Sequence, residues 1–304
     1  MRDEAIVLNF WLIMKGEINF WLVTTEHLEG RLWFRDEDDF KVGMNYVAVQ
    51  AAVGNVSVLA FILMSNHVHF VLKGNRIDAT AFIIGFKTRY AKYFQHKYSE
   101  KEILRRNGVD LKPLPIDDEA IERAIAYVHM NCVAANICSS SMQYEWGSGN
   151  ILFNRTRREG IKLKDISLRK RRQILHCAIQ LPLDWILGMN EYILPDSYLD
   201  IEGAEFYFRT PKRMNYFLAS SSKARKRLES DEDSLPAFRD QVVSAALQDI
   251  CRTLFGCNSL AGLSAEQVTE VLRQIRFRFS SDIRQIARVA GLTYSETAVF
   301  LDQV

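Results

Sequence analysis

The chain has 304 residues, 48% of them hydrophobic and 25% charged, with a formal net charge of +2. Its length exceeds the ~100–200 residues of a typical domain, so we expect two domains, and the apolar content is sufficient for a substantial core. The near balance of positive and negative charge excludes a polycation that binds acidic partners with its whole surface.

Five cysteines, an odd number, occur without a Cys-x-x-Cys pair, and no signal peptide is recognisable. These features predict a reduced, cytoplasmic protein. The apolar stretch 6–14 is too short to span a bilayer, and we expect it to pack onto the first domain as an extra strand or terminal extension. We therefore expect no membrane partner, while the sequence leaves both a monomer and a homodimer open.

The first half of the chain alternates between strand-like and helix-like patterns. Antiparallel strands flanked by helices indicate an α+β fold. In chain order we predict a strand over 20–25, a helix over 37–52 capped by Asp36 or a neighbouring acid, strands over 56–64 and 67–73 joined at Ser65-Asn66, a basic helix over 79–98, a linker over 99–116 that contains Pro113 and Pro115, and a helix over 116–130.

Two histidines, His67 and His69, lie in the second strand of the predicted pair, within an apolar, β-prone stretch. Side chains alternate between the faces of a strand, so both imidazoles point the same way, while Val68 and Phe70 point into the core. Two neutral imidazoles on one rigid surface supply half of a divalent-metal site. The alternative is one hydrogen-bonded core histidine and one surface histidine.

Tyr127 and Asn131 lie four residues apart on the predicted helix that follows, which places them one turn apart on the same face. A phenol ionises near pH ~10 and is a poor nucleophile at neutral pH, unless a metal polarises the electrophile, for example a phosphodiester. We hypothesise that His67, His69 and the amide oxygen of Asn131 hold one Mg²⁺ or Mn²⁺. The alternative for Tyr127 is an ordinary helix tyrosine that packs against the sheet.

The order strand, His-hydrophobe-His, strand, helix and Tyr-x-x-x-Asn resembles the single-tyrosine HUH transposases, and its nearest branch is the REP-associated tyrosine transposases. The resemblance covers roughly residues 15–155 and is carried by the segments 19–25, 63–69, 127–136 and 144–148. Cys132 and Asn136 stand where the family pattern usually has proline and glycine. Neither change removes a proposed chemical group, so the resemblance implies an active enzyme.

The same resemblance implies a ferredoxin-like antiparallel sheet with helices for the first domain. It implies that Tyr127 attacks the scissile phosphate of hairpin-flanked single-stranded DNA and forms a 5′-phosphotyrosine link with a free 3′-hydroxyl. A hydroxyl from another strand end reverses the step, so DNA strand transfer needs no ATP.

The basic helix over 79–98 carries two rival tyrosines, Tyr90 and Tyr93, neither of which has an asparagine or glutamine four residues later. We interpret the helix as a DNA-binding surface on which Lys87, Arg89 and Lys92 contact phosphates. For Tyr93 we expect a role in core packing.

The second domain is expected over 156–304 and is mainly helical. Positive charge gathers in it at Lys162, Lys164, 169–172 and 223–227. Such clusters are typical of proteins that follow a phosphate backbone, but solvated helix faces explain any single cluster equally well.

Residues 283–304 have the outline of a helix-turn-helix. Gly291 supplies the turn, and Thr293 with Glu296 forms a capping box that opens the second helix. That helix is the candidate reader of duplex DNA. An ordinary helical hairpin fits the same pattern, so both interpretations stay open.

The competing function is a non-catalytic DNA-binding regulator derived from such a transposase. Replication initiators and relaxases are a second alternative, but they commonly add a third histidine or a carboxylate to the metal site and often use two tyrosines. A hydrolytic metalloenzyme would need a carboxylate partner for His67 and His69, and the sequence shows no obvious one.

Overall fold

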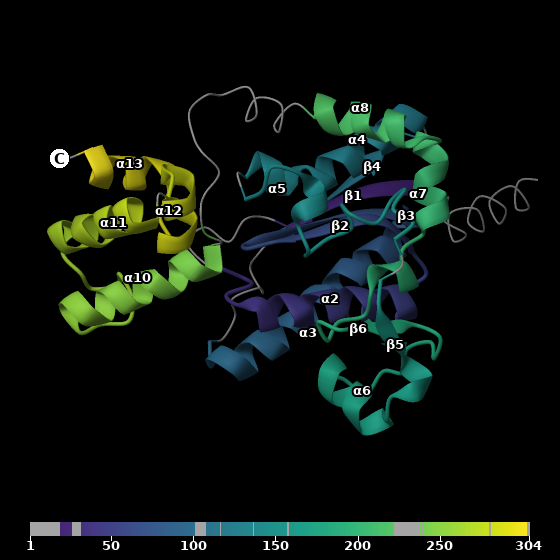
Figure 1. The fold of residues 1–304 in the computed structure, drawn as a ribbon, viewed down its shortest axis with the longest axis horizontal. Helices are drawn as coiled ribbons and strands as arrows, with labels where there is room; N and C mark the ends of the chain where they lie inside the picture. The colour runs from purple at the N-terminus through teal and green to yellow at the C-terminus, as the bar shows by residue number, and fades with distance from the viewer. Residues whose placement is uncertain are drawn as a thin grey trace, which may run out of the picture.

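The structure is a computed structural model that describes residues 19–25, 32–100, 108–115, 117–135, 137–156, 158–221, 238, 240–279 and 281–302. The predicted terminal extension at 6–14, the basic cluster at 223–227 and Asn136 lie outside these residues. The chain folds as an α+β protein in which helices cover both faces of a four-stranded antiparallel sheet (Figure 1). Within the described residues, no helix has the length and apolar character needed to cross a membrane.

The sheet has the ferredoxin-like strand order β2-β3-β1-β4, so the two central strands are β3 and β1. Thr24 pairs with His69 between β1 and β3, and Met64 pairs with His67 between β2 and β3. The predicted strand pair and its break at Ser65-Asn66 are confirmed. The strands are β1 Asn19–Thr25, β2 Ser57–Met64, β3 His67–Gly74 and β4 Val109–Leu114.

The edge strand β4 corrects the prediction of a linker over 99–116. It pairs with β1, and Pro113 lies opposite Trp21. Proline lacks the N–H that a central strand must donate, but an edge strand tolerates it where that position faces away from its neighbour. Most side chains of β4 are exposed, so the sequence lacks the apolar run that usually signals a strand.

Two long helices, α2 (Glu37–Val53) and α3 (Arg76–Tyr98), cover one face of the sheet. Asp36 caps α2 as predicted, because its carboxylate accepts a hydrogen bond from the Asp39 amide at 2.9 Å. Phe70 of β3 contacts Phe82 and Phe86 of α3, with ring centroids 5.2 and 5.8 Å apart.

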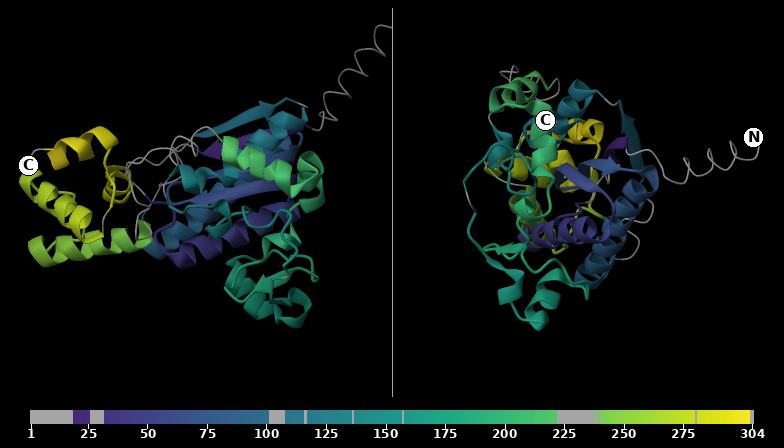
Figure 2. Two further views of the ribbon diagram at one scale, coloured as in Figure 1. Left: turned by 45° about the horizontal axis from the view of Figure 1, so that its top comes forward. Right: turned by 90° about the vertical axis from the view of Figure 1, so that its right-hand side faces the viewer.

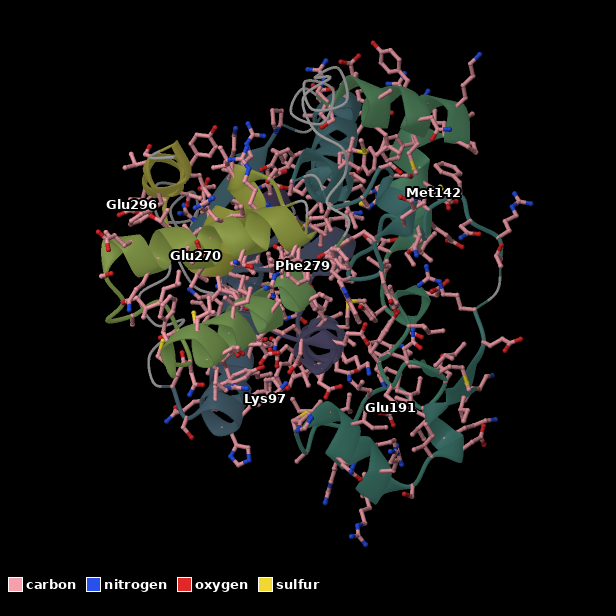
Figure 3. All side chains as sticks on the ribbon, turned by 60° about the vertical axis from the view of Figure 1, so that its left-hand side comes forward. Lys97, Met142, Glu191, Glu270, Phe279 and Glu296 are labelled. Atoms are coloured by element: carbon pink, nitrogen blue, oxygen red, sulfur yellow. The ribbon has the colours of Figure 1, made fainter. Side chains whose placement is uncertain are left out.

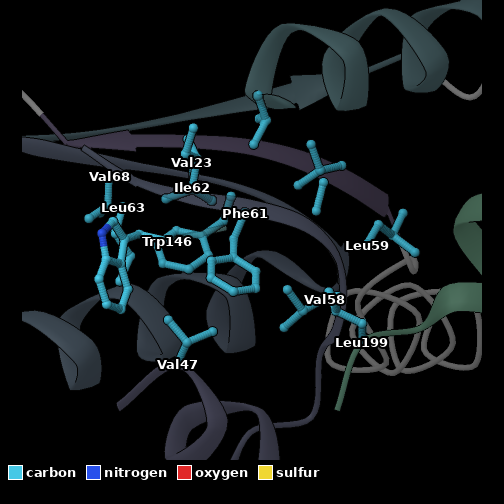
Figure 4. Close-up of a cluster of buried hydrophobic side chains, with 14 of the residues drawn as sticks. Val23, Val47, Val58, Leu59, Phe61, Ile62, Leu63, Val68, Trp146 and Leu199 are labelled. Atoms are coloured by element: carbon cyan, nitrogen blue, oxygen red, sulfur yellow. The ribbon is translucent and has the colours of Figure 1, made fainter. Parts of the chain in front are cut away.

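The apolar core on this side of the sheet continues onto α2. Figure 4 shows Val68 and Phe61 from the sheet close to Trp146 and to Val47 of α2, and all four side chains are buried. The expectation that Val68 and Phe70 point into the core is therefore confirmed.

The opposite face of the sheet is covered by the helix that carries Tyr127 and by helices from later in the chain (Figure 1). Glu122 of α4 is fully buried and receives two hydrogen bonds from the guanidinium of Arg213 on α8, so α8 holds α4 in place. The helices are α4 Asp118–His129, α5 Asn131–Ala134, α7 Ile201–Phe208 and α8 Pro211–Ser220.

A small unit packs on the outer side of α2, where Ala48 and Val49 meet apolar side chains from residues 163–193. It contains a two-stranded antiparallel sheet, which the expectation of helices and turns after residue 155 did not include. Its elements are β5 Gly160–Lys162, α6 Leu168–Leu175 and β6 Ile186–Gly188. Single 3₁₀ turns occur at Ser141–Gln143, Leu163–Asp165 and Pro195–Ser197.

A helical bundle lies at one end of the sheet, beside the turn between β2 and β3 (Figures 1 and 2). It has its own buried cluster, whereas the sheet's cluster continues through Phe217. The division expected at residues 155 and 156 stays a prediction, and the buried packing shows no break at that position. The bundle consists of α10 Asp240–Phe255, α11 Ala265–Phe279, α12 Ile283–Ala290 and α13 Tyr294–Asp302.

The predicted helical pair at the end of the chain is present as α12 and α13. Gly291 ends α12 with a φ of 78°, the left-handed conformation that glycine adopts without strain. The capping box is confirmed, because Glu296 accepts a hydrogen bond from the Thr293 amide and donates its own amide to the Thr293 hydroxyl. Duplex DNA binding by this pair stays a prediction.

Candidate active site

His67 and His69 lie side by side at the start of β3, on the face of the sheet opposite Phe70 and α3. Their ring centroids are 4.7 Å apart, and the rings are nearly perpendicular. Only 6% of His67 and 1% of His69 is exposed. The alternative of one core and one surface histidine is therefore wrong, because both imidazoles are buried on the same face.

Each imidazole is oriented through its Nδ1 atom. Nδ1 of His67 lies 2.8 Å from Oδ1 of Asn66, and Nδ1 of His69 lies 2.9 Å from the hydroxyl of Thr24. An amide oxygen only accepts hydrogen bonds, so Nδ1 of His67 carries the proton and Nε2 keeps the lone pair. Histidines that bind metals in proteins are oriented in this way by a partner at the other ring nitrogen.

Tyr127 reaches the histidine pair from α4. Its ring centroid is 5.4 Å from that of His69, and the two rings meet edge to face. The side chain is half-buried and packs against the buried cluster of the sheet. A phenol and two imidazoles, brought from two distant segments of the chain, thus form one site.

Asn131 is tied to Tyr127 in a different way from the one predicted. The helix does not continue through Met130: α4 ends at His129, Met130 adopts a turn conformation, and Asn131 begins α5. The side-chain amide of Asn131 instead donates a hydrogen bond to the carbonyl of Tyr127 at 2.8 Å. This bond fixes the amide, and Oδ1 is the atom with which Asn131 would bind a metal.

Cys132, at the position where the resembled family has proline, also contacts the end of α4. Its thiol is buried and donates a hydrogen bond to the carbonyl of His129 at 3.3 Å. A carbonyl at the end of a helix has no partner within the helix, and the thiol supplies one.

His129 anchors α4 to the edge of the sheet. Its Nε2 lies 2.9 Å from the hydroxyl of Ser148, which also accepts a hydrogen bond from the Phe61 amide of β2 at 2.9 Å. Burial lowers the pKa of His129 to about 4, so its ring is neutral near pH 7. The residue holds the Tyr127 helix against the edge of the sheet through Ser148.

The Trp146-Gly147-Ser148 element runs beside the outer edge of β2. Leu63 donates its amide to the carbonyl of Trp146 at 2.8 Å, and the Ser148 amide binds the carbonyl of Phe61 at 2.9 Å. A Cβ on Gly147 would lie 2.8 Å from that carbonyl, so only glycine fits there. The sequence motif drew attention to this element, but its role in anchoring α4 becomes visible only in the fold.

The residues predicted to bind DNA lie on the other side of the sheet. Lys87, Arg89 and Lys92 belong to α3, and Arg89 and Lys92 line a pocket of about 290 Å³ together with Tyr46 and other residues. The structure therefore does not bring them together with Tyr127. Their role stays a prediction, and a strand bound at both places would have to pass around an edge of the sheet.

The rival tyrosines also belong to the α3 side. Tyr90 is fully buried and donates its hydroxyl to the carbonyl of Trp33 at 2.5 Å. Tyr93 donates its hydroxyl to Asp39 at 3.0 Å. Both phenols are fixed within the α2–α3 layer, away from the histidine pair.

Two oriented imidazoles and the amide oxygen of Asn131 are ligand types that a divalent ion accepts. Across the described part of the chain, no group of three or more His, Cys, Asp or Glu side chains is arranged to hold a metal. Comparisons with known protein families, with curated proteins and with solved structures give no match. The geometry of the site is therefore the basis for assigning a function.

Ser148→Ala should destabilise the fold by about 1–3 kcal/mol, because His129 and the Phe61 amide each lose a buried hydrogen-bond partner. Urea unfolding measures this change. Ser139→Ala is the matched control, since Ser139 is exposed and bonds only to the Gln143 side chain in the described structure. Equal stabilities of the two variants would contradict the anchoring role of Ser148.

Proposed function

We propose that the protein is a metal-dependent transposase and endonuclease for single-stranded DNA, of the HUH type with one tyrosine. The observation that carries this proposal is the contact between Tyr127 and His69 of the histidine pair, whose ring centroids are 5.4 Å apart. A nucleophile beside two oriented imidazoles is the arrangement that metal-assisted phosphodiester cleavage needs.

His67, His69 and Asn131 would hold one Mg²⁺ or Mn²⁺. When bound, the ion supplies Lewis-acid polarisation of a phosphate oxygen. The chain itself supplies the orientation: Asn66 and Thr24 direct Nε2 of the imidazoles, and the bond from Asn131 to the Tyr127 carbonyl sets the amide.

In the proposed reaction the hydroxyl oxygen of Tyr127 attacks the scissile phosphorus. The bond between tyrosine oxygen and phosphorus forms as the bond from phosphorus to the 3′ oxygen breaks. The phenol proton passes to solvent, and the 3′ oxygen takes up a proton. The products are a 5′-phosphotyrosine link and a free 3′-hydroxyl, and attack by another 3′-hydroxyl transfers the strand without further energy input.

The proposed substrate is single-stranded DNA with a hairpin beside the cleavage site. We further propose a cytoplasmic location, which the five cysteines support, since all five are free thiols in the structure.

Thr24→Val should weaken Mn²⁺ binding about 10–100-fold, because the hydrogen bond that orients His69 is lost while the side-chain shape is kept. Isothermal titration calorimetry with Mn²⁺ measures the affinity. Thr88→Val is the control, since Thr88 is exposed on α3 across the sheet. Unchanged affinity in Thr24→Val, or in a variant with both His67→Ala and His69→Ala, would place the metal elsewhere.

Tyr127→Phe should abolish an SDS-resistant protein–DNA adduct that the wild type forms with Mn²⁺, because phenylalanine has no nucleophilic oxygen. The substrate is a library of labelled single strands with a hairpin and randomised flanks, and sequencing of the recovered adducts gives the cleavage site. Tyr216→Phe is the matched control, because Tyr216 is an exposed tyrosine on α8.

Tyr93→Phe tests the rival nucleophile and should retain the adduct. An adduct that survives in Tyr127→Phe contradicts the assignment of the nucleophile. A wild type that yields no adduct from the whole library contradicts the enzyme proposal.

A second candidate function is a non-catalytic DNA-binding regulator derived from such a transposase. The helical pair α12–α13 with its capping box favours it, since a helix-turn-helix needs this local geometry. Binding of hairpin DNA at equal affinity in Mn²⁺ and in EDTA, without adduct, supports the regulator. Metal-dependent cleavage supports the transposase.

A further inference from the structure

A pocket of about 260 Å³ adjoins His67 and lies between the β2–β3 turn and the C-terminal helical bundle. The β2–β3 turn and Ile137 supply one wall. Arg284, Arg288 and Tyr294 from α12 and α13 supply the other. The pocket thus joins the candidate metal site to the C-terminal bundle, residues 240–302, which lies beside the end of the sheet in Figure 1.

A buried ionic network fixes the bundle at this position. Asp240 is 3% exposed and accepts two hydrogen bonds from Arg288, at 3.0 and 3.1 Å, and one from Gln285 at 3.1 Å. Ser65, two residues before His67, donates its hydroxyl to the same carboxylate at 3.0 Å. The wall formed by α12 therefore has a defined position relative to His67.

The charge of Asp240 is maintained within this network. Burial raises the pKa of the carboxyl, but the guanidinium of Arg288 and the hydrogen bonds from Gln285 and Ser65 outweigh it and hold the pKa below its ordinary value. Asp240 and Arg288 neutralise each other, so the remaining positive charge of the pocket comes from Arg284.

Arg284 and Tyr294 provide the groups that bind one nucleotide. Arg284 is exposed and makes no ion pair within the described residues, so its guanidinium can take a phosphate in a bidentate manner. Tyr294 is 56% exposed, and its ring can stack on a base. A volume of about 260 Å³ is below the ~300–1,000 Å³ of sites that enclose a whole small molecule, which suits one unit of a longer strand.

We propose that this pocket binds a nucleotide of the single strand next to the scissile phosphate, with Arg284 on a phosphate and Tyr294 against the base. The proposal rests on the proposed function, because it places the strand at His67. Under this proposal, α12 and α13 of the bundle contact the single strand. Figure 3 shows the bundle from its outer side, with Glu270 and Phe279 of α11 and Glu296 of α13 labelled.

The test measures binding of a short fluorescein-labelled oligothymidylate, and of a duplex of equal length, by fluorescence anisotropy in EDTA with the full chain. Arg284→Ala should weaken single-strand binding about 10-fold. The slope of log affinity against log salt concentration should fall by about one, because one phosphate contact is lost. Tyr294→Ala should weaken it about 10-fold, and Tyr294→Phe should bind as the wild type does, because the aromatic face is kept.

Arg273→Ala is the matched control, since Arg273 is a half-exposed arginine of α11 outside the pocket. Circular dichroism melting curves check that each variant is folded, and Arg284→Lys supplies a version that keeps the charge. Unchanged single-strand binding by Arg284→Ala and Tyr294→Ala overturns the proposal. If the two variants bind only the duplex more weakly, the proposal is also overturned, and α13 is assigned to duplex DNA.

This experiment tests the pocket independently of the proposed nuclease activity, because binding in EDTA needs neither metal nor cleavage. Weakened binding in both pocket variants, with no adduct from the wild type, contradicts the nuclease and leaves the pocket as a single-strand site. Adduct formation by the wild type, with unchanged binding in both variants, contradicts the pocket alone.

Discussion

The site depends on β3, a central strand of a sheet that helices cover on both faces. Because side chains alternate, the strand that gives Val68 and Phe70 to the core beneath α2 and α3 must present His67 and His69 to α4. A slip of one residue in the pairing with β1 would exchange the two sets and bury the imidazoles in an apolar core. Buried imidazoles need hydrogen-bond partners, and the same register brings Thr24 opposite His69.

The position of the phenol depends on contacts from several later parts of the chain. Ser148 holds the end of α4 through His129, and Arg213 of α8 binds the buried Glu122 in its middle. Removal of either partner would leave a buried polar group without compensation, which proteins tolerate poorly. Helices α7 and α8 are thus part of the scaffold that places Tyr127.

Local patterns predicted most of the sheet and the residues of the site, because alternation and capping are properties of short segments. The strands around His67, the cap at Asp36 and the box at Thr293 are of this kind. β4 was missed because an edge strand needs neither an apolar run nor the N–H that Pro113 lacks. The position of Lys87 across the sheet and the contact of Asp240 with Ser65 depend on which distant surfaces meet, and no short segment carries that information.

The docked bundle links the two roles considered for α13. A helix-turn-helix reads duplex DNA with the first turn of its second helix, and in this chain that turn begins with Tyr294 beside the His67 pocket. The same residues cannot face a major groove and this pocket at once. If the bundle left the β2–β3 turn, Asp240 would lose its hydrogen bond from Ser65 and a buried ion pair would open to solvent. The network therefore holds Tyr294 beside the proposed nucleotide pocket, where a duplex at α13 would compete with a single strand for this residue.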